Sequence, residues 1–549
     1  MVESGDWLVP RYRGETFFDK PALAYWLMAA SQLWAGTTPG AARAVPASAA
    51  ILVLLATIAL GAELFDRRSA LWGGLVLAST FAFVTFGHMA MSDMLLALWS
   101  TLAVTLAVRA FRPPAPAAVV PALGAVLGLG FLTKGPIALV LPGLAVLALW
   151  WPRRRDPLPV TPGGLAAATL LFAVFGLGWF VLVWRRLGGG PLEYFFLREN
   201  LERFAGEAYD VGRPPWFYLP TYFAEGVPWS AFLPLALWRG RGDAEGRAGR
   251  RLLVAWILLA LVPLSLSRGK IDYYLLPLYP AVSLLVGRFF AAAPWGPLEA
   301  WWSRAVLGAA AIVLGLVARV PARLAESWLP SAGAQRLLVV VAAAAALACA
   351  LAALRPTPKR VAAALAGGGG AVALVLVAFF LPAFWAGQPN RTIAAVVQRE
   401  QLWRPDATFA LCSDPSRAQR DVLFYARVPV LERCDLWALA ASKSPFLLLV
   451  RPEERESFRA IPGFREIARY AYLPASALTL DGLLEPPSQG EMVLAANYRT
   501  ADPEAGRRRR REYKKMLYLE QFHPELPAAE LAERLESQRP PADAASGLR

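Results

Sequence analysis

Long apolar stretches alternate with short polar loops from residue 46 to residue 381. Each stretch has roughly 15–23 residues, close to the ~20 that an α-helix needs to cross a bilayer. The pattern therefore predicts an α-helical polytopic membrane protein with about twelve spans. We expect these spans at residues 46–64, 71–89, 93–111, 117–133, 136–151, 164–184, 216–238, 252–267, 275–292, 304–320, 336–354 and 361–381. Residues 21–35 are apolar but short, and this predicts a helix lying on the membrane surface.

The pattern changes after residue 387. The short apolar runs ATFALCS, PFLLLVR and MVLAAN predict strands, and SRAQRDVLFYA and PEERESFRAI between them predict helices. We therefore divide the chain into a membrane domain, residues 1–387 with an outer loop and interfacial helices in 1–45, and a small α/β domain, residues 388–549. If the second domain lies in an oxidising compartment, Cys412 and Cys434 can form a disulfide or stay as two buried thiols. The basic run Arg507–Arg511 is either a solvated tail or a contact with anionic lipids.

Composition supports a membrane protein and narrows the ligands. Hydrophobic residues make up 56% of the chain and charged residues 18%, against about 25% charged in soluble domains. The net charge of +15 comes mainly from residues 1–387, which carry 32 basic and 19 acidic side chains. The excess thus sits among the predicted spans, where it indicates topology and not nucleic-acid binding. Two His and three Cys without a CxxC pair argue against a His/Cys metal site, so any divalent cation would need carboxylates.

Alternate loops carry the basic residues, which places these loops in the cytoplasm. They contain Arg67 and Arg68, Arg109 and Arg112, Arg153 to Arg155, Arg239 to Arg251, and Arg355 to Arg360. The other loops and the C-terminal domain then lie outside the membrane. An even number of spans would also put the N-terminus outside, although the chain opens MVESGDW with no apolar leader. We therefore expect one further span to precede Met1; a miscounted span is the alternative.

Three charged residues lie in apolar surroundings near the outer ends of predicted spans. Lys20 opens the interfacial helix and can pair with a lipid phosphate, or its side chain can simply reach the surface. Asp93 begins a span, where a carboxylate is either functional or a helix cap. Lys134 lies in the tight turn LTKGP, as a phosphate partner or a turn cation.

Two later segments add candidates on the same side. The segment 195–210 predicts an amphipathic helix whose Arg203 either reaches an anionic head or faces solvent. In SRGKIDYYLLPLYP, Arg268, Lys270 and Tyr274 can bind phosphate oxygens. Glu225 is another acid in an apolar context, which we assign to the acceptor or headgroup with Arg203. Together these residues suit a ligand with a lipid tail and an anionic head.

Several of these motifs resemble a known family. SGDWLVPRYRGETFFDKPALAYWL, MSDMLL, FLTKGP and GKIDYYLLPLYP resemble, in matching order, motifs of the dolichyl-phosphate-mannose-protein mannosyltransferase-like superfamily, and more closely its bacterial aminoarabinose lipid A transferase branch, glycosyltransferase family 39/83. The resemblance covers residues 1 to about 390. It implies a GT-C fold in the inner membrane of a bacterium, with the active site and the C-terminal domain outside the cytoplasm.

The resemblance also implies an activity and roles for single residues. It implies inverting transfer of a sugar from a polyprenyl-phosphate donor to a hydroxyl of lipid A, another glycan or a protein. Lys20 and Tyr274, with Tyr273 as a one-residue alternative, match donor-phosphate ligands, and Asp93 matches an acid that begins a later span. The family's catalytic Asp-Glu pair would precede this sequence, so no base is assigned beyond the candidate Asp93. Asp19 is the candidate metal ligand, with metal dependence open.

Other classes of protein remain as alternatives at this point. A transporter or flippase of lipid-linked sugars would bind the same headgroup, but no internal repeat is evident. A non-catalytic membrane scaffold and an oligosaccharyltransferase are further alternatives. A WWD motif would favour the last, and neither Trp150-Trp151 nor Trp301-Trp302 is followed by Asp.

Overall fold

The computed structural model describes most of the predicted membrane domain and the strands of the C-terminal domain. Up to residue 380, all residues are described except 3, 13–14, 113, 156–159, 207–211, 293, 320 and 322–330. Beyond that, it describes Ile393, Pro445 and the five strands β3 (Thr408–Leu411), β4 (Val430–Leu431), β5 (Phe446–Val450), β6 (Arg465–Tyr472) and β7 (Gly490–Ala496).

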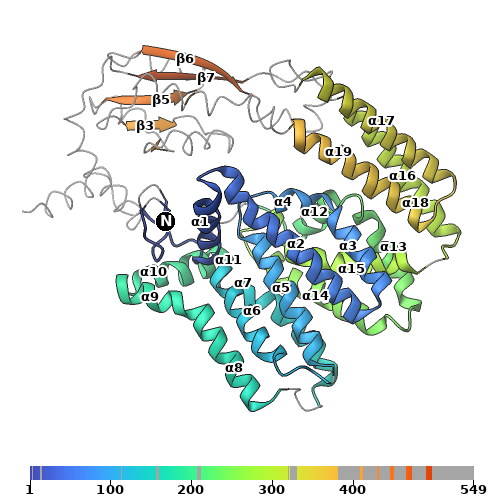
Figure 1. Ribbon diagram of the computed structural model, residues 1–549, viewed down its shortest axis with the longest axis horizontal. Helices are drawn as coiled ribbons and strands as arrows, with labels where there is room; N and C mark the ends of the chain where they lie inside the picture. The colour runs from blue at the N-terminus through green and yellow to red at the C-terminus, as the bar shows by residue number, and fades with distance from the viewer. Residues whose placement is uncertain are drawn as a thin grey trace, which may run out of the picture. The chain divides into compact units, whose positions relative to one another are not determined.

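Long apolar helices dominate the described part of the chain (Figure 1). Eight segments within it are long and apolar enough to cross a bilayer. They are α2 (Pro39–Leu64), α5 (Asp93–Ala110), Pro162–Leu187, α14 (Arg247–Leu266), Asp272–Ala291, α16 (Pro297–Val317), α17 (Ala332–Leu354) and Pro358–Phe380. A ninth follows if α3 (Arg67–Ala78) and α4 (Phe81–Gly87), bent by 64°, form one span. The chain is thus a multi-pass helical membrane protein.

The predicted count of about twelve spans is wrong, since three predicted spans are short or interrupted. Helices α6 (Val119–Lys134) and α7 (Ile137–Trp150) have 16 and 14 residues. At 1.5 Å per residue they reach only about 24 and 21 Å, less than the ~30 Å of a hydrocarbon core. The stretch 216–238 divides into α12 (Tyr218–Glu225) and α13 (Leu233–Arg239). Gly226 and Pro228 interrupt it, because proline cannot donate a helical hydrogen bond. The expected span before Met1 stays a prediction.

Shorter elements connect the spans. The helix predicted at 21–35 is present as α1 (Leu23–Ala35), which follows the strands β1 (Arg11–Tyr12) and β2 (Glu15–Thr16); its place at the membrane surface stays a prediction. The remaining elements of the first half are η1 (Trp151–Arg153), α8 (Pro162–Phe172), η2 (Ala173–Leu177), α9 (Gly178–Leu187), α10 (Gly190–Glu193), η3 (Tyr194–Glu202) and α11 (Arg203–Ala205). Those of the second half are η5 (Pro215–Phe217), η6 (Ser230–Phe232), η7 (Gly240–Gly242), η8 (Asp272–Leu278), α15 (Tyr279–Ala291), α18 (Pro358–Ala362), η11 (Ala363–Gly368), α19 (Gly369–Val375) and η12 (Leu376–Phe380).

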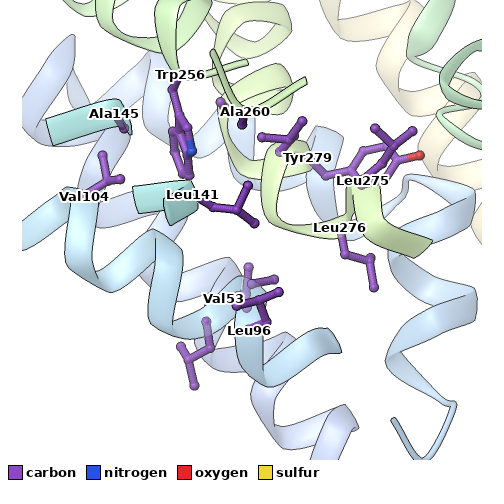
Figure 2. Packing of buried hydrophobic residues seen from close by; sticks show 14 of the residues in the cluster. Val53, Leu96, Val104, Leu141, Ala145, Trp256, Ala260, Leu275, Leu276 and Tyr279 are labelled. Atoms are coloured by element: carbon purple, nitrogen blue, oxygen red, sulfur yellow. The ribbon is translucent and has the colours of Figure 1, made fainter. Parts of the chain in front are cut away.

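The core of the helical part lies between α2, α5, α7, α14 and the η8–α15 segment. Figure 2 shows Val53, Leu96, Leu141, Trp256 and Leu276 from these elements, each almost fully buried. Helices α3 and α15 also pack closely. A Cβ atom added at Gly287 would lie 2.3 Å from the backbone nitrogen of Gly73, so glycine allows the two backbones to approach.

The C-terminal strands form one sheet in the order β4-β3-β5-β7-β6. Strand β3 runs parallel to β4 and β5, and β7 runs antiparallel to β5 and β6. The three predicted strands are confirmed as β3, β5 and β7, whereas β6, whose sequence REIARYAY mixes charged and apolar residues, was missed. The predicted helices in this domain, Cys412, Cys434 and the Arg507–Arg511 run lie outside the described residues.

Candidate active site

A buried ion pair joins two helix ends that are 41 residues apart. Asp93 is the first residue of α5 and Lys134 the last of α6, and the Lys134 ammonium donates to the Asp93 carboxylate. Their side chains are only 6% and 9% exposed. An acid at a helix N-terminus and a cation at a C-terminus also complement the helix dipoles. The pair therefore holds the N-terminus of α5 and the C-terminus of α6 together.

Two tyrosine rings complete the surroundings of the Lys134 ammonium. It lies 4.5 Å from the centroid of the Tyr274 ring and 5.9 Å from that of Tyr273, distances typical of cation–π contacts. The Tyr273 ring also packs edge-on against Phe86. Both tyrosines that the sequence left as alternatives thus lie beside one cation.

The turn after Lys134 brings this cation next to the segment that contains Phe195. Gly135 has a φ of +67°, and a Cβ atom there would lie 2.6 Å from Cζ of Phe195. Only glycine therefore fits this turn. Phe195 belongs to the π-helix η3, and π-helical turns occur often at functional sites.

The π-helix supplies an acid that holds two further cations. The Glu199 carboxylate lies 2.8 Å from the Arg203 guanidinium and 3.5 Å from the Lys20 ammonium. Its side chain is 3% exposed, against 28% for Arg203 and 26% for Lys20. Exposed apolar side chains at Leu197 and Leu201 lie on the same segment, as the predicted surface helix requires.

Asp19 lies next to Lys20, one of the two cations around Glu199. The Tyr194 hydroxyl donates to its carboxylate at 3.0 Å, and the Lys20 ammonium donates to its backbone carbonyl at 2.7 Å. Burial raises the pKa of Asp19, and the charge of Glu199 adds to the rise. In the part of the chain that the structure describes, Asp19 belongs to no group of three metal-ligating side chains.

The charges of Glu199, Arg203 and Lys134 all act on Lys20. Burial lowers the pKa of Lys20, Glu199 opposes this shift, and the positive charges of Lys134 and Arg203 lower the pKa further. Lys20 and Arg203 share the Glu199 carboxylate of η3, and the turn after Lys134 packs against the same π-helix, so the three cations lie in one region. We call Lys20, Lys134 and Arg203 the cation cluster.

The predicted cations of the later loop are held differently. The Arg268 N–H donates to the carbonyl of Phe204 at 3.0 Å, which attaches the loop to α11. Lys270 is 5% exposed, and its ammonium donates to the Ser267 carbonyl at 2.6 Å. Their role in phosphate binding stays a prediction.

Glu225 lies at the end of α12 and has an unusual environment. Within the described residues its buried Oε2 has no hydrogen-bond partner. Burial raises the pKa of Glu225 to about 7, and the charge of Asp272 adds to this shift.

Sequence reasoning missed Glu199, Tyr194 and Asp272. Glu199 lies four residues before Arg203, the spacing at which helical side chains pair, so this signal was available. Tyr194 contacts Asp19 across 175 positions, so no local pattern distinguishes it. Asp272 lies next to the candidate Tyr273 and accepts a hydrogen bond from its N–H, so the sequence offered a signal for Asp272.

A family model matches the first part of the chain. Residues 19–179 match the family model of dolichyl-phosphate-mannose-protein mannosyltransferase. This segment is therefore similar to that family. It contains Lys20, Asp93 and Lys134, so three residues of the site lie within the family's matched region.

Curated relatives match a longer stretch of the chain. An undecaprenyl phosphate-alpha-4-amino-4-deoxy-L-arabinose arabinosyl transferase of Sodalis glossinidius is 33% identical over 296 residues, 53% of this chain and 52% of the relative. A transferase of the same name from Pseudomonas aeruginosa is 34% identical over 293 residues, 52% of each chain. The chain thus spans about half the length of the curated relatives it matches.

A solved structure shows the same fold over most of the chain. The crystal structure of ArnT from Cupriavidus metallidurans bound to undecaprenyl phosphate has a TM-score of 0.66 and 21% sequence identity, covering 92% of this chain and 93% of that one. The fold is therefore that of ArnT, which confirms the expected GT-C architecture.

Proposed function

We propose that this chain transfers a sugar from a polyprenyl-phosphate donor to an acceptor hydroxyl at the outer face of the bacterial inner membrane. The observation that carries the proposal is the cation cluster, because three cations from separate segments gather around the π-helix η3, and Tyr274 lies beside one of them, Lys134. Such a site suits a phosphate attached to a lipid. The family match and the arabinosyl transferase relatives support the same reaction.

The geometry suggests how the cluster would assist transfer. The acceptor oxygen forms a bond to the anomeric carbon as the bond from that carbon to the phosphate oxygen breaks, which inverts the configuration. The departing phosphate takes the electron pair, and the acceptor proton passes to a base. Lys20, Lys134 and Arg203 would stabilise the charge that develops on the phosphate. Asp93 would act in this arrangement by holding Lys134 in place.

We further propose lipid A as the acceptor, because the sequence motifs resemble those of the aminoarabinose lipid A transferase branch. A different glycan or a protein hydroxyl would use the same donor site. The acceptor is therefore tested separately from the donor, by offering lipid A, a glycan and a peptide in parallel.

The Lys20→Ala variant tests the donor site. The full chain, purified in detergent, is mixed with a radiolabelled polyprenyl-phosphate sugar and each acceptor, and product is counted. We expect transfer by the unchanged protein and a loss of about 100-fold or more in the variant, as for other preorganised charge-stabilising groups. The exposed Lys359 on α18 gives a matched control, Lys359→Ala, which should keep full activity. Equal turnover by Lys20→Ala and Lys359→Ala would refute the role of Lys20. Absence of product with every acceptor would refute the transferase function.

A further inference from the structure

A groove with two arginines lies between α17 and the span that follows it, Pro358–Phe380. Its lining residues are Ala348, Leu351, Ala352, Leu354, Arg355, Arg360, Ala363 and Ala364. The groove has a volume of about 630 Å³, within the ~300–1,000 Å³ that is typical of ligand sites. Apart from the two arginines, its wall is entirely apolar.

The packing of the two helices explains where the groove lies. A Cβ atom added at Gly368 would lie 3.0 Å from Cβ of Ala345, so the helices are in close contact at this level. The groove lies nearer the loop of residues 355–357 that connects the helices. Thr357 caps the next helix by accepting a hydrogen bond from the N–H of Arg360 at 3.3 Å. The groove is therefore bounded by a helix contact at one end and by a short, capped loop at the other.

Three guanidinium groups from different segments meet at the end of α17. The Arg360 guanidinium donates to the Arg355 carbonyl at 3.1 Å, and that of Arg304, on α16, donates to the Ala353 carbonyl at 3.1 Å. The last carbonyls of a helix have no partner within the helix, so these contacts hold the arginines in place. Since a guanidinium has five N–H donors, one such contact leaves most of them for a ligand.

The positive charge at this end of α17 is not compensated within the described residues. No carboxylate there forms an ion pair with Arg304, Arg355 or Arg360. In another basic loop, by contrast, Arg109 and Arg112 both pair with Glu63. Uncompensated cations at the ends of spanning helices attract anionic lipid head groups.

We propose that this groove binds an anionic phospholipid, with an acyl chain along its apolar wall and the phosphodiester at Arg355 and Arg360. Both flanking helices are long and apolar enough to span a bilayer, so the arginines lie at the level of the head groups. A zwitterionic phospholipid carries a cation of its own, which the arginines would repel. A free phosphate would leave the apolar wall unused. The inference does not rest on the proposed function, because none of these residues belongs to the cation cluster.

The test compares two phospholipids with the same acyl chains. Phosphatidylglycerol carries a net negative charge, and phosphatidylcholine is zwitterionic. Native mass spectrometry of the full chain in a non-ionic detergent measures the fraction of protein with bound lipid at each lipid concentration. Inorganic phosphate is added as a competitor, which tests whether an anion without a chain occupies the same site.

Two kinds of variant separate the head group from the chain. Arg355→Gln combined with Arg360→Gln removes the charge, and Arg112→Gln, at an arginine that already has an acidic partner, is the matched control. Ala363→Phe fills the groove from an exposed position in its wall, and Ala350→Phe, at an exposed position of α17 outside the groove, is the matched control. Unfolding in SDS is followed for each variant to show that it is folded.

We expect the unchanged protein to bind phosphatidylglycerol about 25-fold tighter than phosphatidylcholine, since each arginine near an anionic head group contributes about fivefold. The double arginine variant should lose this preference and still bind phosphatidylcholine as before. Ala363→Phe should weaken the binding of both lipids, whereas the two control variants should bind them like the unchanged protein.

Four results would overturn the proposal. The first is equal affinity of the unchanged protein for both lipids, and the second is a preference that the double arginine variant retains. The third is unaltered binding by Ala363→Phe, because the chain would then lie outside the groove. The fourth is displacement of phosphatidylglycerol by inorganic phosphate, which would identify a site for free anions.

Discussion

Replacing Asp93 with Asn should destabilise the protein more than any surface substitution. The change keeps the size of the side chain but removes its charge, so the Lys134 ammonium loses its carboxylate partner. Both side chains are less than a tenth exposed. Water therefore cannot replace the lost partner without opening the junction of α5 and α6.

The magnitude follows from the burial of the pair. Breaking a buried ion pair on one side costs about 3–5 kcal/mol. The rings of Tyr273 and Tyr274 still face the ammonium in the variant, and such contacts are worth up to about 2 kcal/mol when desolvated. We therefore expect the lower end, about 3 kcal/mol, or a factor of about 100 in the ratio of folded to unfolded protein.

The assay is reversible unfolding by SDS in mixed micelles, followed by tryptophan fluorescence. The double variant Asp93→Asn with Lys134→Met should be more stable than either single variant, because removing both charges restores an uncharged interior. Glu63→Gln removes an acid that pairs with the exposed Arg109 and Arg112, and should cost less than about 1 kcal/mol. A cost for Asp93→Asn as small as that of Glu63→Gln would refute the buried pair.

Two further predictions test the neighbouring contacts. Gly135→Ala should lower the free energy of unfolding by about 1–3 kcal/mol, since the new Cβ would meet the Phe195 ring at a positive φ. The control in the same unfolding assay is Gly143→Ala, which has open space at its Cβ. Equal stability of the two variants would contradict the close contact at Gly135. Glu199→Gln should lower the pKa of Lys20 further, because Glu199 is the largest influence that raises it. Undecaprenyl phosphate binding, measured against pH, should then weaken at a lower pH than in the unchanged protein, and an unshifted profile would show that Glu199 does not act on Lys20.

The sequence predicted those features that depend on the polarity of one residue and of its neighbours in the chain. A charge in an apolar stretch is costly wherever it lies, so Lys20, Asp93 and Lys134 could be selected without knowing their partners. Hydropathy in the same way predicted a helical membrane protein and three of the five C-terminal strands. It overcounted the spans because apolar composition alone does not show that α6 and α7 are short or that Gly226 and Pro228 interrupt residues 216–238.

Tertiary structure decided which of these residues meet. Lys134 contacts Asp93 across 41 positions because α5 and α6 pack side by side, with the start of α5 next to the end of α6. Lys20 meets Glu199 across 179 positions because the π-helix η3 packs against the segment that precedes α1. The free energy of such a pair depends on its distance and its exclusion from water, and both arise only when the helices pack. The sequence thus determined which charges must be compensated, and the packing of the helices determined by which partner.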